Sequence, residues 1–467
     1  MTAADGLPVP RRYWAAIAMG LGIALAVLDA SIANVALPTI ARDLSASPAD
    51  AIWVVNAYQL VVMVLLLPLA AAGELVSYRR VFILGLVLFT LASVLCAFAP
   101  TLEMLVLARV VQGIGAAGIM SVNSAVVRFT YPRHLLGRGI GITALVVAVS
   151  SAAGPTVASA ILSVASWQWL FLVNLPVGIA ALAACRFLPE SPRGKHAFDF
   201  TSALLSALTF GLLILAIDGL GHGGAAWWVV AEVTVALTAG VFLVLRQLTR
   251  THPLLPVDLL RRPIFALSLG TSVCAFMAQV LAYVALPFHL QNAMGHDPVS
   301  TGLLMTPWPL ATALAAPIAG RLADRYPAGI LGGIGLLVFS GGLALLATMP
   351  TDAPNLDIIL RMVICGIGFG LFQSPNNRTI IGSTPPERSG GASGMLGTAR
   401  LLGQTTGAAL VAFAFTVSPT TATMHSLAAG SGVALLAAGV SCLRLMDREG
   451  TAMVWARTRR DGGAPPS

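Results

Sequence analysis

Apolar runs of membrane-spanning length follow one another along the chain, with short polar segments between them. A helix needs about 20 mostly apolar residues to cross the hydrocarbon core of a bilayer. Fourteen such segments can be placed, near residues 13–38, 52–73, 81–99, 103–127, 139–163, 168–187, 200–219, 226–246, 263–288, 300–320, 328–349, 356–377, 390–417 and 425–444. The pattern predicts an all-α polytopic membrane protein with fourteen transmembrane helices.

The overall composition excludes a soluble globular protein. Hydrophobic residues make up 57% of the 467 residues, charged residues make up 10%, and the mean hydropathy is +0.86. Such a chain has too few polar side chains to cover a water-facing surface. The net charge of +8 does not indicate nucleic-acid binding, because the cations occur in ones and twos between apolar segments and form no basic run.

The basic residues fall on one side of the predicted membrane. Of the 27 Arg and Lys residues, 23 lie in the termini or in the loops that follow even-numbered spans. Positively charged short loops stay in the cytoplasm. We therefore expect a multi-pass protein of the bacterial cytoplasmic (inner) membrane with both termini on the cytoplasmic side.

An internal repeat divides the chain into halves. Gly-Ile-Gly occurs at Gly113–Gly115 and again 253 residues later at Gly366–Gly368, and Val-Ala-Leu-Pro occurs at Val35–Pro38 and 249 residues later at Val284–Pro287. Two parallel repeats of six helices are the plan of the major facilitator fold, which binds its substrate between the halves near the midplane. The expected division is an N-terminal six-helix bundle at 1–190, two inserted helices with flanking loops at 191–255, a C-terminal six-helix bundle at 256–448 and a cytoplasmic tail at 449–467.

No motif indicates an enzyme or a bound cofactor. Gly113–Gly118 matches GxGxxG, but it lies inside an apolar helix without a preceding strand, so we expect these small residues to allow close helix packing. The single lysine, Lys195, is followed by His196 where a Walker A loop needs Ser or Thr. Seven scattered His offer no spacing for a metal site. Any transport therefore depends on an ion gradient or on a partner chain.

Asp29 lies inside the first span, where a carboxylate costs about 2.5–3.5 kcal/mol on insertion scales. It shares a face with small residues, and Arg109 of the fourth span lies in the same outer half of the membrane. Burial favours the neutral acid while a nearby Arg favours the carboxylate, so movement of the Arg can switch a proton on and off. The alternative is a static ion pair that joins the two helices. The second repeat has Ala278 in the corresponding place, so coupling chemistry is expected in the N-terminal bundle alone.

Other polar residues within the spans are candidates for a substrate cavity or for hydrogen bonds to neighbouring helices. The candidate cavity residues are Asn34, Tyr58, Gln59, Gln112, Trp308, Gln373, Asn376 and Asn377. Asp218 and Glu232 are expected near a loop or the lipid headgroups. For Arg400, snorkelling or helix packing is the simplest interpretation.

Several segments, taken in order, resemble the fourteen-helix drug:proton antiporters of the major facilitator superfamily, the group that contains quaternary-ammonium and multidrug efflux pumps. Leu28–Pro38 looks like the first-helix motif of that family, and Arg109–Ala117 resembles its motif B, whose Arg is implicated in proton transfer. Ser150–Pro155 resembles the antiporter motif C, in which Gly154 and Pro155 shape a kinked helix.

The same resemblance extends to the cytoplasmic loops. Gly320–Arg325 is similar to motif A, with Asp324 and Arg325, and Gly73–Arg80 is a weaker copy that keeps Glu74, Arg79 and Arg80 but has Ser77 and Tyr78 in place of the usual residues. These residues are implied to form the cytoplasmic gate. Phe372–Asn377 together with Gly394–Gln404 look closer still to the uncharacterised YebQ-type subgroup.

The resemblance implies export of lipophilic or cationic drugs and biocides in exchange for protons, by alternating access. The implied partners are those small molecules, protons and membrane lipids, with no cofactor, no metal and no nucleic acid. A dedicated metabolite exporter or an uptake symporter stays open as an alternative. A non-transporting receptor or scaffold is disfavoured, because the longest hydrophilic stretch is a tail of about 20 residues.

Overall fold

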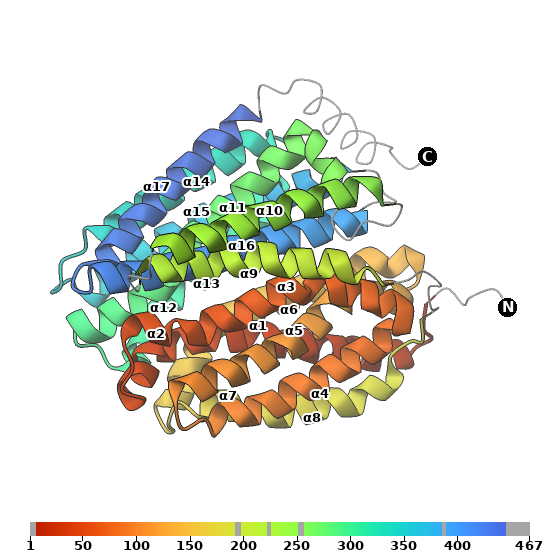
Figure 1. The fold of residues 1–467 in the computed structure, drawn as a ribbon, viewed down its shortest axis with the longest axis horizontal. Helices are drawn as coiled ribbons and strands as arrows, with labels where there is room; N and C mark the ends of the chain where they lie inside the picture. Colours follow the sequence, from red (N-terminus) through yellow and green to blue (C-terminus); the bar gives the residue numbers. More distant parts are fainter. Residues whose placement is uncertain (1–5, 192–197, 222–225, 251–255, 385–388, 445–467) are drawn as a thin grey trace. The chain divides into compact units, whose positions relative to one another are not determined.

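The fourteen predicted spans are present as helices. The computed structural model describes residues 6–191, 198–221, 226–250, 256–384 and 389–444, and within these ranges fourteen helices are long and apolar enough to cross a membrane, with no strand among them (Figure 1). The fold class expected from the apolar pattern is therefore confirmed.

The helices are α1 (Arg11–Asp43), α2 (Pro48–Ala51), α3 (Trp53–Val76), α4 (Tyr78–Ala97), α5 (Leu102–Thr130), α6 (Leu136–Leu162), α7 (Trp169–Leu172), α8 (Asn174–Ala184), α9 (Phe200–Gly221), α10 (Ala226–Thr249), α11 (Pro263–Phe288), α12 (Pro298–Met305), α13 (Pro307–Leu322), α14 (Ala328–Ala347), α15 (Asn355–Gly382), α16 (Ser389–Val417) and α17 (Ala422–Leu443).

Corresponding spans of the two repeats begin in the same way. α2 starts at Pro48 after Ser47, whose hydroxyl accepts the Asp50 N–H, and α12 starts at Pro298 after Asp297, whose carboxylate accepts the Val299 and Ser300 N–H groups. Both are short helices that continue almost directly into a longer one, α3 and α13. Pro suits the first turn because its missing N–H has no helical partner there. The hydrogen bonds from Ser300 lower the pKa of Asp297.

The chain forms two compact units. Unit 1 contains Met1–Leu243 and Pro287–Thr306, and unit 2 contains Val244–Leu286 and Pro307–Ser467. α9, which the sequence places in a separate inserted pair, packs against α3 of unit 1. In unit 1, α5 lies against α3 and α4, and α1 lies against α5, α6 and α8; in unit 2, α14 lies against α15 and α17 (Figure 1).

Glycines set equivalent close contacts in the two repeats. A Cβ on Gly115 of α5 would meet Gly85 and Phe89 of α4, and a Cβ on Gly368 of α15 would meet Gly335 and Phe339 of α14. Without side chains at these positions the helix backbones approach directly, as small residues allow in membrane helices. The predicted packing role of Gly113–Gly118 is therefore confirmed, and the repeat seen in the sequence is also a repeat of contacts.

The motif with Gly154 and Pro155 fixes how α6 meets α1. Pro155 has no N–H, so the carbonyl of Ser151 one turn earlier lacks its helical donor. Ser31 of α1 donates its hydroxyl to that carbonyl at 3.3 Å. Gly154 lies directly over Ser31, and an added Cβ would overlap the Ser31 side chain.

Gly154→Ala is expected to lower the free energy of unfolding by about 1–3 kcal/mol, because the added methyl group overpacks a full contact. Replacing Ser31 with Gly removes the obstructing atoms, so the double variant should recover part of the loss. Thermal unfolding of the purified variants in one detergent measures both effects. Gly137→Ala is the matched control, since a Cβ there meets nothing within 4 Å.

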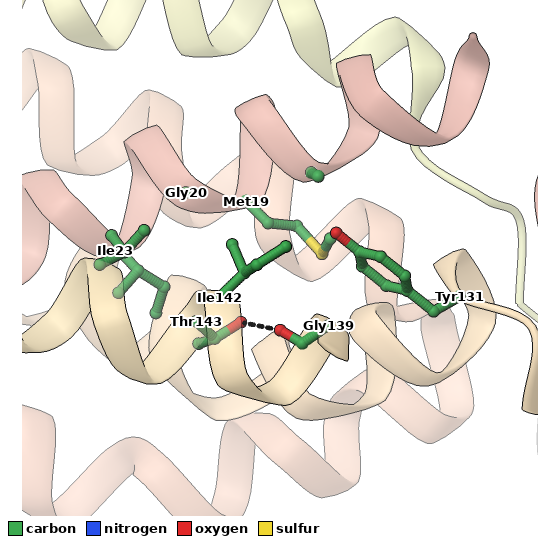
Figure 2. A pocket seen from close by; sticks show the side chains of 9 residues that line it. Met19, Gly20, Ile23, Tyr131, Gly139, Ile142 and Thr143 are labelled. Carbon is green, nitrogen blue, oxygen red and sulfur yellow. Dashed lines mark hydrogen bonds between the residues drawn. The ribbon is translucent and has the colours of Figure 1, made fainter. Parts of the chain in front are cut away.

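A small apolar hollow lies between α1 and α6. Met19 and Ile23 of α1 face Ile142 and Tyr131, and the Thr143 hydroxyl donates to the Gly139 carbonyl at 3.2 Å (Figure 2). Burial raises the pKa of the Tyr131 phenol. The residues that line this hollow include no charged side chain, so it offers no chemistry for proton transfer.

Candidate functional site

Asp29 and Arg109 form a buried ion pair in unit 1. The Arg109 Nη1 donates to Asp29 Oδ2, and the side chains of Arg109 and Asp29 are 0% and 1% exposed. α1 and α5 lie in contact, which brings the two side chains together. The predicted approach of Asp29 and Arg109 is therefore confirmed.

Amides from two further positions complete the hydrogen bonding of the carboxylate. Gln112 donates to Asp29 Oδ1 at 2.9 Å, and Asn174 of α8 donates to the same oxygen at 2.7 Å. Both amides also donate to the Ser93 hydroxyl of α4, at 2.9 and 3.3 Å. The carboxylate thus accepts from three side chains, an arrangement that stabilises a buried charge.

Arg109 is held independently of Asp29. Its Nε donates to the Val54 carbonyl of α3 at 2.8 Å, its Nη1 also donates to Gln112 Oε1 at 2.5 Å, and its guanidinium lies 4.2 Å from the centre of the Tyr58 ring. The Tyr58 hydroxyl donates to the Ala26 carbonyl of α1 at 2.9 Å, which fixes the ring. These contacts do not involve Asp29, so the guanidinium has partners other than the carboxylate.

Five helices therefore meet at one polar cluster, which we call the Asp29 cluster: Asp29, Tyr58, Ser93, Arg109, Gln112 and Asn174. All six residues are buried, with Asp29 2% and Tyr58 3% exposed. The ion pair is neutral as a whole, which limits its desolvation penalty. Addition of one proton to Asp29 would leave a buried cation.

The described residues of the second repeat contain no copy of the Asp29 cluster. The offset of 253 residues takes Arg109 to Met362 and Gln112 to Cys365, and the offset of 249 takes Asp29 to Ala278. All three counterparts are fully buried. The fold thus accepts apolar side chains at these positions, so packing alone does not require the charges in unit 1.

The structure places the candidate cavity residues of unit 1 in different surroundings. Tyr58 and Gln112 belong to the Asp29 cluster. Asn34 is buried and donates to the Ala30 carbonyl one turn earlier at 3.2 Å. Gln59 is 7% exposed, and its buried Oε1 has no partner among the described residues. A lining role for Asn34 and Gln59 stays a prediction.

The candidate cavity residues of unit 2 also lie in different surroundings. Asn376 is buried, donates to the Ser272 hydroxyl at 2.8 Å and accepts from Arg444 at 2.7 Å. Trp308 is buried in an aromatic group, 5.0 Å from Tyr283 and 5.6 Å from Phe339 between ring centres. Gln373 and Asn377 are half-buried on α15.

The motif A residues lie at the expected helix ends but pair with other partners. Asp324 forms an ion pair with Arg378 at the end of α15, and the two side chains are 58% and 45% exposed. The Arg79 Nη1 lies 3.7 Å from the Glu190 Oε1. Glu74, Arg80 and Arg325 are exposed. Asp324 and Arg79 therefore pair with residues outside the motif A segments, and the spacing of the motif did not indicate these partners.

Sequence reasoning missed three buried polar residues. Asn174 and Ser93 both belong to the Asp29 cluster, and Arg444 bonds to Ser268, Asn376 and Ser441 in unit 2. An isolated amide in the middle of an apolar span is a signal that could have pointed to Asn174. A Ser within a span carries little signal, because it often bonds only to its own helix. Burial lowers the pKa of Arg444 to about 10.

Two further sequence candidates belong to α9 and α10. Glu232 is half-buried on α10 near Gly219 of α9. The side chain of Asp218 lies outside the described residues.

The fold defines a class: a polytopic helical membrane protein of the transporter type. The model of the Major Facilitator Superfamily matches residues 19–408. The chain belongs to the Major Facilitator Superfamily. It is an integral protein of the bacterial inner membrane and a transporter, not an enzyme.

Similar proteins support this assignment. The chain is 56% identical over 445 residues to the uncharacterized transporter YebQ of Escherichia coli K12, covering 95% of this chain and 97% of that protein. It is 31% identical to the riboflavin transporter RibZ of Clostridioides difficile (88% and 90% covered) and 31% identical to the multidrug resistance protein Stp of Mycobacterium tuberculosis (85% and 74% covered). The crystal structure of a D-xylose-proton symporter matches with a TM-score of 0.67 at 15% identity, over 92% of this chain and 97% of that chain. That likeness supports the fold alone.

Proposed function

We propose that this transporter exports lipophilic small molecules, with cationic drugs and biocides among the candidates, in exchange for protons by alternating access, and so contributes to antimicrobial resistance. The Asp29 cluster carries the proposal. In it Asp29 is the proton carrier and Arg109 controls release of the proton. The proton gradient is the energy source, and no cofactor is needed.

Three observations support the coupling role. Asp29 is fully buried and accepts three side-chain hydrogen bonds, so its protonation must disturb contacts with several helices. The second repeat packs Ala278, Met362 and Cys365 at the corresponding positions, so the charges are not a requirement of the fold. Ionisable residues inside membranes are rare and are functional by default.

The direct test is proton movement that depends on substrate. Purified protein in liposomes with an imposed pH gradient should move protons when an exported dye is added, and a protonophore should abolish uphill dye flux. Growth and dye accumulation in overexpressing cells, across a biocide panel with and without protonophore, supply the substrate range. Uphill flux that is insensitive to the pH gradient would refute the proposal, and inward flux driven by the same gradient would make the protein an uptake symporter.

A dedicated metabolite exporter is the second candidate. It is favoured by the likeness to RibZ, whose name specifies riboflavin as its substrate. The two candidates differ in breadth, because a multidrug exporter should lower accumulation of several unrelated dyes. Saturable transport of one polar solute with no effect on the dye panel would favour the metabolite exporter.

The orientation of the chain follows from its charges. Because 23 of 27 cations lie on one side, tags on both termini should be cytoplasmic, and Gly223→Cys, between the seventh and eighth predicted spans, should react with an impermeant maleimide added from outside. Labelling is measured in intact cells and again after permeabilisation. Outside accessibility of the C-terminal tag would contradict the proposed orientation.

The motif A residues Glu74, Arg79, Arg80, Asp324 and Arg325 are proposed to act at a cytoplasmic gate. Exposed ion pairs are worth about 0–1 kcal/mol, so loss of the pair between Asp324 and Arg378 should shift the conformational equilibrium by about fivefold at most. Asp324→Asn and Arg378→Gln should each raise the labelling rate of a cytoplasmic cavity cysteine by similar factors. Asp352→Asn, an exposed acid outside the helices, is the control. Unchanged labelling in both pair variants would argue against this gate.

A further inference from the structure

Arg400 is a guanidinium without a partner in the middle of unit 2. It lies on α16, it is half-buried, and its buried Nε has no hydrogen-bond partner among the described residues. Within that part of the chain Arg400 also forms no ion pair. Arg109 and Arg361, the other Arg within predicted spans, each pair with a carboxylate.

In the described spans of unit 2, no free acid is present to neutralise Arg400. Asp357 is the one acidic residue within the six described spans from Pro263 to Leu443, and it pairs with Arg361 near the start of α15. Arg400 is eleven residues from the first residue of α16, which places it about 16 Å along the helix. That depth is beyond the headgroups and close to the middle of the span.

α16 is at least half-buried around Arg400. No residue of α16 from Gly394 to Thr416 is in the exposed class. Gly403 and Gly407, one and two turns beyond Arg400, bring α16 into backbone contact with Val273 and Met277 of α11. A charged side chain inside a membrane almost always faces the protein interior or a water-filled space. Snorkelling, the simplest interpretation from the sequence, therefore does not account for Arg400.

The fold does not require a cation at this position. Gly141 and Gly394, and Gly154 and Gly407, share the offset of 253 residues, and the same offset relates Val147 to Arg400. The first repeat thus packs a valine where the second has an arginine. Arg400 is thus a positive charge inside a span that has no carboxylate partner among the described residues, whereas Arg109 is paired with Asp29.

We propose that Arg400 binds an anionic group of the transported compound. The substrate class is then a lipophilic molecule that carries a carboxylate, sulfonate or phosphate. This inference rests on the proposed function, because it selects among the lipophilic compounds that the transporter exports. A guanidinium offers several N–H donors to such a group, and it repels a molecule whose only charge is positive.

Two dyes with one scaffold test the inference: rhodamine 110, which has a free carboxylate, and rhodamine 123, its methyl ester. Fluorescence anisotropy with the purified full-length protein measures the dissociation constant of each dye. The parent protein is expected to bind the acid at least about tenfold more tightly than the ester, since charge-assisted hydrogen bonds are worth roughly that factor or more. Arg400→Gln should weaken binding of the acid by about 10- to 100-fold and should not weaken binding of the cationic ester, and Arg400→Lys should keep part of the preference.

Stability separates ligand binding from a structural role. Removal of an unpaired buried charge should leave the melting temperature of the Arg400→Gln protein equal to that of the parent or higher. Arg361→Gln, which breaks a paired arginine at the end of a span, is the matched control and should not change the ratio of acid to ester binding. An unchanged ratio in Arg400→Gln, equal binding of both dyes by the parent, or binding of neither would overturn the assignment. Displacement of rhodamine 110 by phosphatidylglycerol at equal molar amounts would make the site a lipid site and would also overturn it.

The binding assay does not depend on proton coupling, because the Asp29→Asn protein should bind both dyes as the parent does. A parent protein that shows proton-driven export but binds both dyes equally would reject this inference alone. An acid preference that depends on Arg400, without any proton-driven flux, would reject the proposed function alone.

Discussion

Asp29→Asn should abolish uphill, proton-driven export while exchange of substrate down its gradient continues. Asparagine keeps the shape but only one of the two acceptor oxygens, so it can accept either from Gln112 and Asn174 or from Arg109, and it cannot bind and release a proton. Arg109 retains the Val54 carbonyl and the Tyr58 ring, so the loss of stability should stay near 1–3 kcal/mol. Substrate-induced proton movement in liposomes, measured on correctly folded protein, decides the result.

The matched control is Asp357→Asn, the same change at an acid in unit 2 that pairs at the end of a span. It should keep proton-driven export. If Asp29→Asn drives uphill export with the pH dependence of the parent, Asp29 is structural and the proton takes another route.

Arg109→Met should both stop active export and lower the free energy of unfolding by about 3–5 kcal/mol. The change leaves the Asp29 carboxylate buried without its cation, and breaking a buried pair from one side has a cost of this size. Met362 shows that the corresponding position of unit 2 accepts a methionine, so size alone does not explain a loss. Thermal and denaturant unfolding of the purified variant provide the measurement.

The double variant Asp29→Asn with Arg109→Met separates charge from packing. It removes both charges, so its stability should return most of the way to that of the parent, while export stays absent. Arg361→Met is the control, because its pair with Asp357 is partly exposed and should contribute about 1 kcal/mol or less. If the double variant loses as much unfolding free energy as the two single variants together, Asp29 and Arg109 act on stability independently. The charge pair would then not be the source of the effect.

The fold was predictable from the sequence because a bilayer leaves few choices. A span must be long, apolar and helical to satisfy its backbone hydrogen bonds, so all fourteen spans are visible in the pattern of hydrophobic residues. The repeat was also visible, because Gly113 and Gly366 occupy positions where any side chain would strike the neighbouring helix. Division into units was less accessible, since packing of α9 against α3 leaves no trace in the local pattern.

The candidate site was only partly predictable. The high cost of a charge in a membrane singles out Asp29, Arg109 and Arg400 from the sequence without any coordinates. An uncharged residue such as Asn174 or Ser93 has a low cost when it bonds within its own helix, so its role depends on contacts between helices.

The sequence by itself therefore determined the class of protein, the number of spans, the internal repeat and the buried charges, because each follows from the free energy of placing residues in a membrane. Only the tertiary structure decided which charges are compensated. It surrounds Asp29 with Arg109, Gln112 and Asn174 from two other helices, and it leaves Arg400 without a partner in the described part of unit 2. Hydrogen bonding acts over about 3 Å, so residues 80 and 145 positions apart in the chain become partners only when their helices pack together.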